Sequence, residues 1–122
     1  MRTILTVDDS PSMRQMVRAT LESAGYGVVE ATDGQEALEF ARTRNVDLVI
    51  CDVNMPRMDG ITLVRELRTL SGYRLTPLLL LTTESSQDKK FEGKRAGATG
   101  WIVKPFNPNQ LLATLDRLLS AA

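Results

Sequence analysis

One stretch decides how this chain folds, residues 3–21, which read TILTVDDSPSMRQMVRATL. Residues 3–7 are mainly apolar and β-branched, so they predict a buried strand. Ser10 and Pro11 predict the start of a helix, because a capping residue is followed there by proline at the first helical position. The residues that would face the core then recur at helical spacing, namely Met13, Met16, Val17, Thr20 and Leu21. The stretch therefore predicts a strand followed by an amphipathic helix, which ends at Gly25.

The same alternation of strand and helix continues to the end of the chain. Four more apolar runs of strand length lie at residues 27–31, 47–51, 78–81 and 101–103. Each is followed by a segment with helical signals, such as the capping box of Asp33 and Glu36. Runs that are apolar without alternation indicate strands buried on both faces, and hence a parallel sheet between helices. The predicted fold class is therefore α/β, a flavodoxin-like doubly wound sheet of five strands in the order 2-1-3-4-5.

The composition excludes several classes of protein. A length of 122 residues predicts a single domain over residues 1–122. Histidine is absent, so the chain carries no Ser-His-Asp triad, no Cys-His pair and no histidine of its own to phosphorylate. The 15 basic and 15 acidic residues give zero net charge, which argues against nucleic acid as a partner.

Location and assembly are also constrained. No apolar run exceeds four residues, so we expect neither a membrane-spanning helix nor a signal peptide. The single cysteine, Cys51, fits a reducing compartment, so we expect a cytoplasmic protein in which this thiol is part of the core. The polar composition offers no obvious stripe for self-association, which favours a monomer.

Polar side chains follow four of the five predicted strands. They are Asp8 and Asp9, then Asp52, then Thr82 and Thr83, then Lys104 and Pro105. In the order 2-1-3-4-5 these four strands are neighbours, so their carboxyl ends share one cleft. Crowded carboxylates recruit a cation, and oxygen ligands suit Mg²⁺, with Mn²⁺ as an alternative. A carboxylate there can act as a nucleophile and form an acyl phosphate, while Lys104 balances charge and Thr82 binds a phosphoryl oxygen.

These residues resemble the receiver domain family of response regulators, over residues 3–120. The resemblance is carried by Val7-Asp8-Asp9-Ser10, Cys51-Asp52-Val53-Asn54-Met55-Pro56, Met58-Asp59-Gly60, Leu81-Thr82-Thr83 and Val103-Lys104-Pro105-Phe106. Each motif alone is weak, but all occur in order and at the spacing of the family.

The resemblance implies a set of roles. Asp52 would be phosphorylated by a partner histidine kinase, and Thr82 and Lys104 would contact the phosphoryl group. Mg²⁺ would be held by Asp9, Asp52 and the backbone carbonyl of Asn54, with Asp8 acting mainly through water. The flanking residues of the site would be Thr83, Glu84 and Pro105, and the Lys104–Pro105 bond would be cis.

Within the family, the chain resembles stand-alone chemotaxis regulators of the CheY type. This similarity implies that Thr82 moves toward the phosphoryl group and that Trp101 turns inward behind it. The output surface would be the fourth helix, fifth strand and fifth helix, including Lys89, Lys90, Lys94 and Trp101. A flagellar motor switch protein would be the target, and a phosphatase a further partner. Trp101 stands where chemotaxis members usually have tyrosine, and Thr83 where many members have alanine.

The same residues admit other interpretations. Asp8 and Asp9 alone could be acids that favour a helix N-terminus. The basic residues of the fourth helix could form a solvated face or a docking patch for an acidic peptide. Alternative functions are a phosphorelay intermediate, a phosphate sink, a regulator of type IV pili and, less favoured, a Mg²⁺-dependent phosphohydrolase.

Overall fold

Five apolar segments form one parallel sheet in the order β2-β1-β3-β4-β5. The computed structural model describes residues 1–83 and 86–120. Its strands are β1 (Thr3–Val7), β2 (Gly27–Ala31), β3 (Leu48–Asp52), β4 (Leu78–Thr82) and β5 (Gly100–Val103). Its helices are α1 (Pro11–Ser23), α2 (Gly34–Thr43), α3 (Gly60–Leu67), the 3₁₀ turn η1 (Ser71–Tyr73), α4 (Gln87–Ala96) and α5 (Pro108–Ser120). The predicted fold class and strand order are confirmed.

The third strand is shifted by one residue from its predicted position, and the reason lies in its pairing. Asp52 is the last residue of β3, because it pairs with Leu81 of β4 despite its charge. Asp47 lies just before the strand and exchanges two hydrogen bonds with Thr3: its carboxylate accepts from the Thr3 amide at 2.7 Å, and its own amide donates to the Thr3 carbonyl at 2.8 Å. The strand therefore ends at Asp52, at the carboxyl edge of the sheet.

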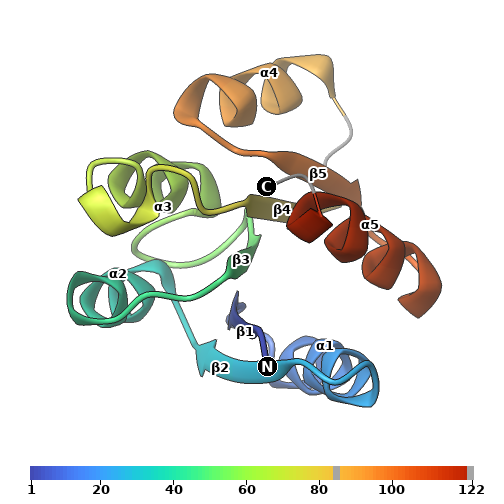
Figure 1. Ribbon diagram of the computed structural model, residues 1–122. Helices are drawn as coiled ribbons and strands as arrows, with labels where there is room; N and C mark the ends of the chain where they lie inside the picture. Colours follow the sequence, from blue (N-terminus) through green and yellow to red (C-terminus); the bar gives the residue numbers. More distant parts are fainter. Residues whose placement is uncertain (84–85, 121–122) are drawn as a thin grey trace.

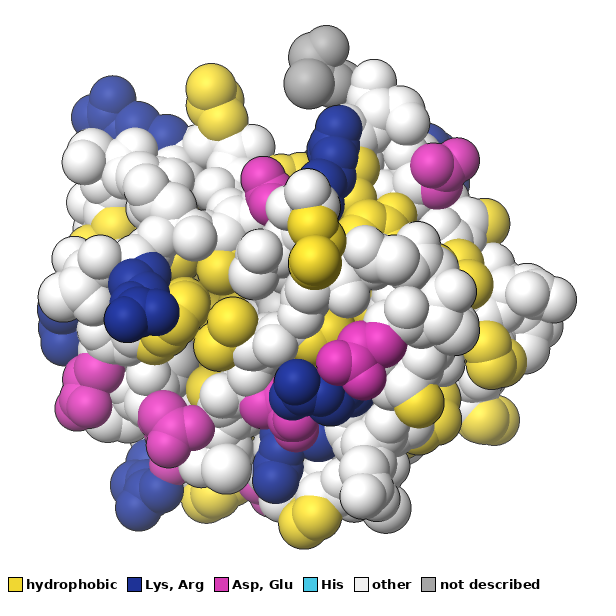
Figure 2. All heavy atoms as spheres, turned by 60° about the horizontal axis from the view of Figure 1, so that its bottom comes forward, with side chains coloured by type: hydrophobic (Ala, Val, Ile, Leu, Met, Phe, Trp, Pro, Cys, Tyr) yellow, Lys and Arg dark blue, Asp and Glu magenta, His cyan; other side chains and the backbone are white. Residues whose placement is uncertain are grey.

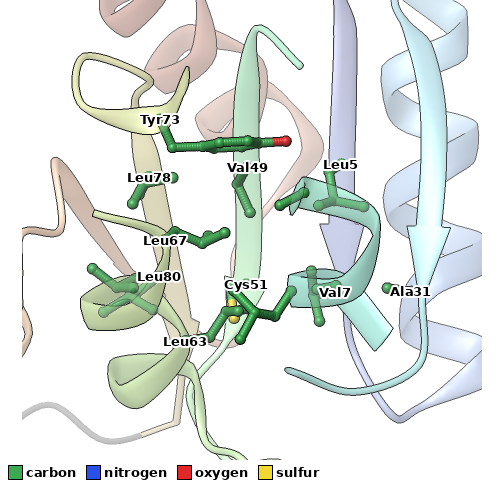
Figure 3. Packing of buried hydrophobic residues seen from close by; sticks show 14 of the residues in the cluster. Leu5, Val7, Ala31, Val49, Cys51, Leu63, Leu67, Tyr73, Leu78 and Leu80 are labelled. Carbon is green, nitrogen blue, oxygen red and sulfur yellow. The ribbon is translucent and has the colours of Figure 1, made fainter. Parts of the chain in front are cut away.

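The helices cover both faces of the sheet (Figure 1). On one face α1 and α5 pack over a cluster that includes Val17, Ile50 and Leu115. On the other face α2, α3 and α4 cover a second cluster, part of which Figure 3 shows around Val49 and Cys51 of β3. Because apolar side chains fill both faces of β1, β3 and β4, only the ends of these strands can carry polar groups. Cys51 is buried, as predicted.

Capping residues fix where the helices begin. Ser10, Asp33, Asp59 and Ser86 each accept a hydrogen bond from the backbone amide three residues on. The predicted capping box of α2 is present in modified form, because the Glu36 carboxylate accepts from the amide of Thr32 rather than from that of Asp33. Gly25 has a φ of +90° after α1, where the sequence predicts a glycine stop.

Arg68 joins the end of α3 to the end of α4. Its guanidinium donates to the backbone carbonyls of Tyr73 at 2.6 Å and Thr76 at 2.8 Å. It also donates twice to the carbonyl of Gly97, at 3.0 and 2.8 Å. Burial lowers the pKa of Arg68. One side chain therefore satisfies carbonyls from two separate segments, residues 73–76 and Gly97, and links the end of α3 to the end of α4.

The surface carries mixed charge. In the face shown in Figure 2, basic and acidic side chains are interspersed rather than gathered by sign. This agrees with the zero net charge of the sequence. Among residues 1–83 and 86–120, every helix is too short or too polar to span a bilayer.

Candidate functional site

Four strands deliver polar side chains to the carboxyl edge of the sheet, as the sequence predicts. Asp52 ends β3, Thr82 ends β4, and Asp8 and Lys104 follow β1 and β5 directly. The register places these strand ends side by side, because Val7 pairs with Cys51 and Thr82 pairs with Val103. The topology alone therefore brings together residues that lie up to 96 positions apart in the chain.

Three carboxylates meet at this edge. Asp8, Asp9 and Asp52 each place one oxygen within 4.8 Å of the others. Asp8 and Asp52 are buried, with 3% and 6% of their surface exposed, whereas Asp9 is exposed. Oxygen ligands at such spacing fit a hard divalent cation such as Mg²⁺ or Mn²⁺, which keeps part of its water shell. The exposed side of the cluster leaves room for that water.

Lys104 is the cation that the structure places against this cluster. Its Nζ donates to Asp52 Oδ1 at 2.9 Å and lies 3.7 Å from Asp8 Oδ2. The backbone amide of Lys104 donates to the carbonyl of Thr82 at 2.7 Å, which fixes the start of the loop after β5. The Lys104–Pro105 peptide is cis, which confirms what the resemblance implies. Among the described residues, the Lys104 ammonium therefore pairs with the two buried carboxylates of a cluster of three.

The excess of negative charge at this edge of the sheet contributes to a raised pKa of Asp52. Burial is the main cause that raises its pKa, and the neighbouring charges of Asp8 and Asp9 raise it further. The hydrogen bond and charge of Lys104 act in the opposite direction without cancelling the rise. The site therefore holds more negative charge than its surroundings stabilise, and a divalent cation would relieve the excess.

Arg14 supports the acidic loop, and the sequence analysis missed this role. Its Nη1 donates to the backbone carbonyl of Asp8 at 2.7 Å, and its Nε lies 3.1 Å from Glu30 on β2. The Ser10 amide donates to Asp8 Oδ1 at 2.9 Å from the other side. No local pattern indicates this role, because the pairing of Arg14 with Glu30 depends on how α1 packs against β2.

The structure brings some of the other predicted site residues into the cleft and leaves others at its margin. Thr82 is fully buried at the end of β4. Thr83, Asn54 and Pro105 are exposed next to the cleft. Glu84 lies outside the described residues. The roles expected for the flanking residues therefore stay predictions.

Trp101 and two lysines share a surface pocket. Lys90, Lys94 and Trp101 line it, together with Ala98, Thr99 and Gly100, around a volume of about 280 Å³. The half-buried indole lies against Gly93 of α4, and its buried Nε1–H has no acceptor among the residues that the structure describes. Lys89 is not among the residues that line the pocket, and its ammonium lies 3.8 Å from Glu92.

Comparison with known proteins identifies relatives of this arrangement. The family model of the response regulator receiver domain matches residues 4–116. The chemotaxis protein CheY4 of Vibrio cholerae is 56% identical, with a TM-score of 0.93 over 97% of this chain and 98% of that chain. The receiver domain of the sensor histidine kinase PA1611 from Pseudomonas aeruginosa, with a magnesium ion coordinated in its active site cleft, is 30% identical, with a TM-score of 0.92 over 98% of both chains.

Curated relatives are longer proteins. The alkaline phosphatase synthesis transcriptional regulatory protein PhoP of Bacillus subtilis is 37% identical over 116 residues, which cover 95% of this chain and 48% of PhoP. SrrA of Staphylococcus aureus, a transcriptional regulatory protein, is 35% identical over 95% of this chain and 47% of its own length. The chain thus spans about half the length of these curated relatives.

Proposed function

The chain belongs to the response regulator receiver domain family, and on that premise we propose that Asp52 accepts a phosphoryl group from a histidine kinase in a Mg²⁺-dependent reaction. Receiver domains are phosphoacceptor switches of two-component systems rather than classical enzymes. The observation that carries the proposal is the site itself. A buried carboxylate, Asp52, lies 2.9 Å from the Lys104 ammonium and within 4.8 Å of two further carboxylates.

The chemistry follows from these contacts. A carboxylate oxygen of Asp52 attacks phosphorus, the new O–P bond forms, and the P–N bond of the kinase phosphohistidine breaks with its electron pair going to the imidazole. Mg²⁺, held by Asp9, Asp52 and the Asn54 carbonyl, with Asp8 through water, would neutralise charge on the phosphoryl oxygens. Lys104 stabilises the same oxygens, because its ammonium already lies against Asp52.

We further propose that phosphorylation is read at the surface of α4, β5 and α5. Thr82 ends β4 beside β5, so a movement toward the phosphoryl group would reach Trp101 through adjacent strands. Lys90, Lys94 and Trp101 line one pocket, whose apolar wall and two cations suit an acidic peptide that carries an apolar side chain. The similarity to CheY4 favours chemotaxis, with a flagellar motor switch protein as target and a phosphatase as a further partner.

The remaining elements of the proposal follow from the same family. We propose a monomeric cytoplasmic regulator in which residues 1–122 act as one receiver domain, and the unpaired, buried Cys51 agrees with a reducing compartment. A role as a phosphorelay intermediate or phosphate sink is the second candidate, because the receiver domain of a sensor kinase is also similar to this chain.

Acetyl phosphate with Mg²⁺ tests the proposal directly. Intact-mass measurement should show the gain of one phosphoryl group in the wild type and none in Asp52→Asn. Asp116→Asn is the matched control, because Asp116 is an exposed aspartate on α5. Uptake by the Asp52→Asn variant would refute the assignment, and sustained turnover of small phosphomonoesters would favour a phosphohydrolase instead.

Partner binding separates the two candidate functions. An acidic motor-switch peptide should bind the phosphorylated form more tightly than the unphosphorylated form. The variant Lys90→Gln/Lys94→Gln should lose this preference, while Lys89→Gln, which changes a lysine outside the pocket, should keep it. Phosphoryl uptake without any change in peptide binding would favour the phosphate sink.

A further inference from the structure

Arg57 has a backbone conformation that needs an explanation. Its φ is +67°, in the left-handed region that arginine rarely adopts, and among the described residues it is the only non-glycine residue there. It lies in the middle of the loop of residues 53–59 between β3 and α3. Such a conformation persists where surrounding contacts hold it in place. The side chain of Arg57 supplies such a contact.

The guanidinium of Arg57 pairs with the carboxylate of Asp33 on the neighbouring β2–α2 turn. Asp33 is the N-cap of α2, and its other oxygen accepts from the amide of Glu36 at 2.8 Å. Asp33 is 5% exposed, so its position is set by the fold. The Arg57 side chain is itself 74% exposed, so the ion pair joins the surface of the loop to a fixed point.

A second contact supports the same docking. The side chain of Met58 lies so close to Gly34 that a β-carbon at position 34 would come within 2.9 Å of Met58 Cβ. Met58 also packs against the core cluster between the sheet and α2 and α3. The ends of the loop are fixed independently, because the Val53 amide donates to Leu81 and the Gly60 amide to Val53. The loop is thus held at both ends and in the middle.

We propose that Arg57 is a positioning residue, which clamps this loop to Asp33 so that the backbone carbonyl of Asn54 is ready to bind Mg²⁺. This inference rests on the proposed function, in which that carbonyl is a ligand of the metal. The residues present fit the cation, since the oxygens of Asp8, Asp9 and Asp52 lie within 4.8 Å of one another. A loop that is ordered before binding loses less entropy when the metal binds. Removing the clamp therefore lowers the affinity for Mg²⁺.

The direction in which the Mg²⁺ affinity changes distinguishes a positioning role of Arg57 from a purely electrostatic one. Arg57 is a cation on the loop that precedes α3, and loss of a nearby positive charge would raise the affinity for Mg²⁺. Loss of a clamp lowers it. A purely structural role would change the unfolding midpoint and leave the affinity unchanged.

Calorimetric titration with Mg²⁺ is the test, on four variants of the whole chain. Arg57→Gly removes the side chain and keeps the left-handed backbone without strain. Asp33→Asn removes the charge of the partner and keeps a good N-cap. The double variant measures their coupling, and Arg57→Lys retains a cation that can reach the carboxylate.

We expect Arg57→Gly, Asp33→Asn and the double variant to bind Mg²⁺ about tenfold more weakly, at the lower end of the effect of outer-shell changes, with Arg57→Lys close to the wild type. Without metal, amide exchange at Met58 should accelerate in Arg57→Gly while that of Leu80 stays unchanged. Equal or tighter Mg²⁺ binding by Arg57→Gly would overturn the clamp. If the wild type itself binds no Mg²⁺, the proposed function fails, whereas unchanged Met58 exchange refutes the clamp alone.

Discussion

Replacing Asp52 by asparagine should make the metal-free protein more stable, although it removes the proposed phosphoacceptor. At an effective dielectric of about 20, Asp8 lies within 4.8 Å of Asp52 and repels it by at least about 3.5 kcal/mol. Asp9 is exposed, so screening reduces its share to about 1 kcal/mol. Lys104 at 2.9 Å attracts Asp52 by about 6 kcal/mol on the same scale. The attraction to Lys104 exceeds these two repulsions by at most about 1.5 kcal/mol, so the larger cost of burying the Asp52 carboxylate decides the sign.

We therefore expect Asp52→Asn to raise the free energy of unfolding by about 1–2 kcal/mol at pH 7 in the presence of a chelator. The asparagine oxygen still accepts from Lys104, and Asp8 keeps that ammonium as its partner at 3.7 Å. Urea unfolding of the wild type, Asp52→Asn and Asp116→Asn measures the effect, and the Asp116 variant should change little because Asp116 is exposed.

The advantage of Asp52→Asn should depend on pH in a definite direction. The pKa of Asp52 is raised in the folded protein, so the folded state takes up a proton at a higher pH than the unfolded chain. The destabilisation caused by the ionised Asp52 carboxylate is thus fully present above its pKa in the folded protein. It fades as the pH falls and is gone below the ordinary value of 3.8. An advantage that grows on acidification would contradict this account.

Mg²⁺ should reverse the order of stability. A ligand at 100 times its dissociation constant adds about 2.7 kcal/mol to the free energy of unfolding. The wild type should gain this amount, and Asp52→Asn much less, because it lacks one carboxylate of the cluster. An Asp52→Asn protein that is clearly less stable than the wild type without metal would refute the reasoning. The attraction to Lys104 would then outweigh both repulsion and burial.

Three further pairs of substitutions test the packing that positions the site, each by urea unfolding. Gly60→Ala should cost about 3 kcal/mol, because its β-carbon would collide with the backbone of β3, whereas Gly25→Ala, with open space but a φ of +90°, should cost about 1 kcal/mol. Arg68→Met should cost about 2–4 kcal/mol by leaving four backbone carbonyls without their donor, and Arg65→Met, at an exposed position of α3, should cost little. Trp101→Phe should stay within about 1 kcal/mol of the wild type, because it removes some ring area and a buried N–H that has no acceptor in the described part of the chain, while Trp101→Ala should cost about 3 kcal/mol.

The fold could be predicted from the sequence because its main signals are local and periodic. The apolar runs, the Ser10–Pro11 start and the Gly25 stop each act within a few residues. The acidic cleft could be predicted as well, because a parallel sheet gathers strand ends at one edge whatever the separation in sequence. A charge at the end of an apolar run is ambiguous, and so the position of Asp52 within β3 was wrong by one residue.

Contacts between distant side chains could not be predicted. The pairs of Arg14 with Glu30 and of Arg57 with Asp33 depend on how separate elements pack, and neither leaves a periodic signal. The basic residues of α4 are an intermediate case. Lys90 and Lys94 are four residues apart and line the Trp101 pocket together, so helical phase alone could have separated them from Lys89.

Labelling of Cys51 can report how often the core of this protein opens. Cys51 is the only thiol in the chain, is 1% exposed, and immediately precedes the proposed phosphoacceptor in the central strand. Burial raises its pKa well above the usual range, so a thiol reagent can react with it only when the packing over β3 opens. The rate of labelling therefore measures how often the core opens around the strand that carries Asp52. Bound Mg²⁺, phosphorylation or a docked partner should each slow the labelling of Cys51 by the factor by which it lowers the population of the open state.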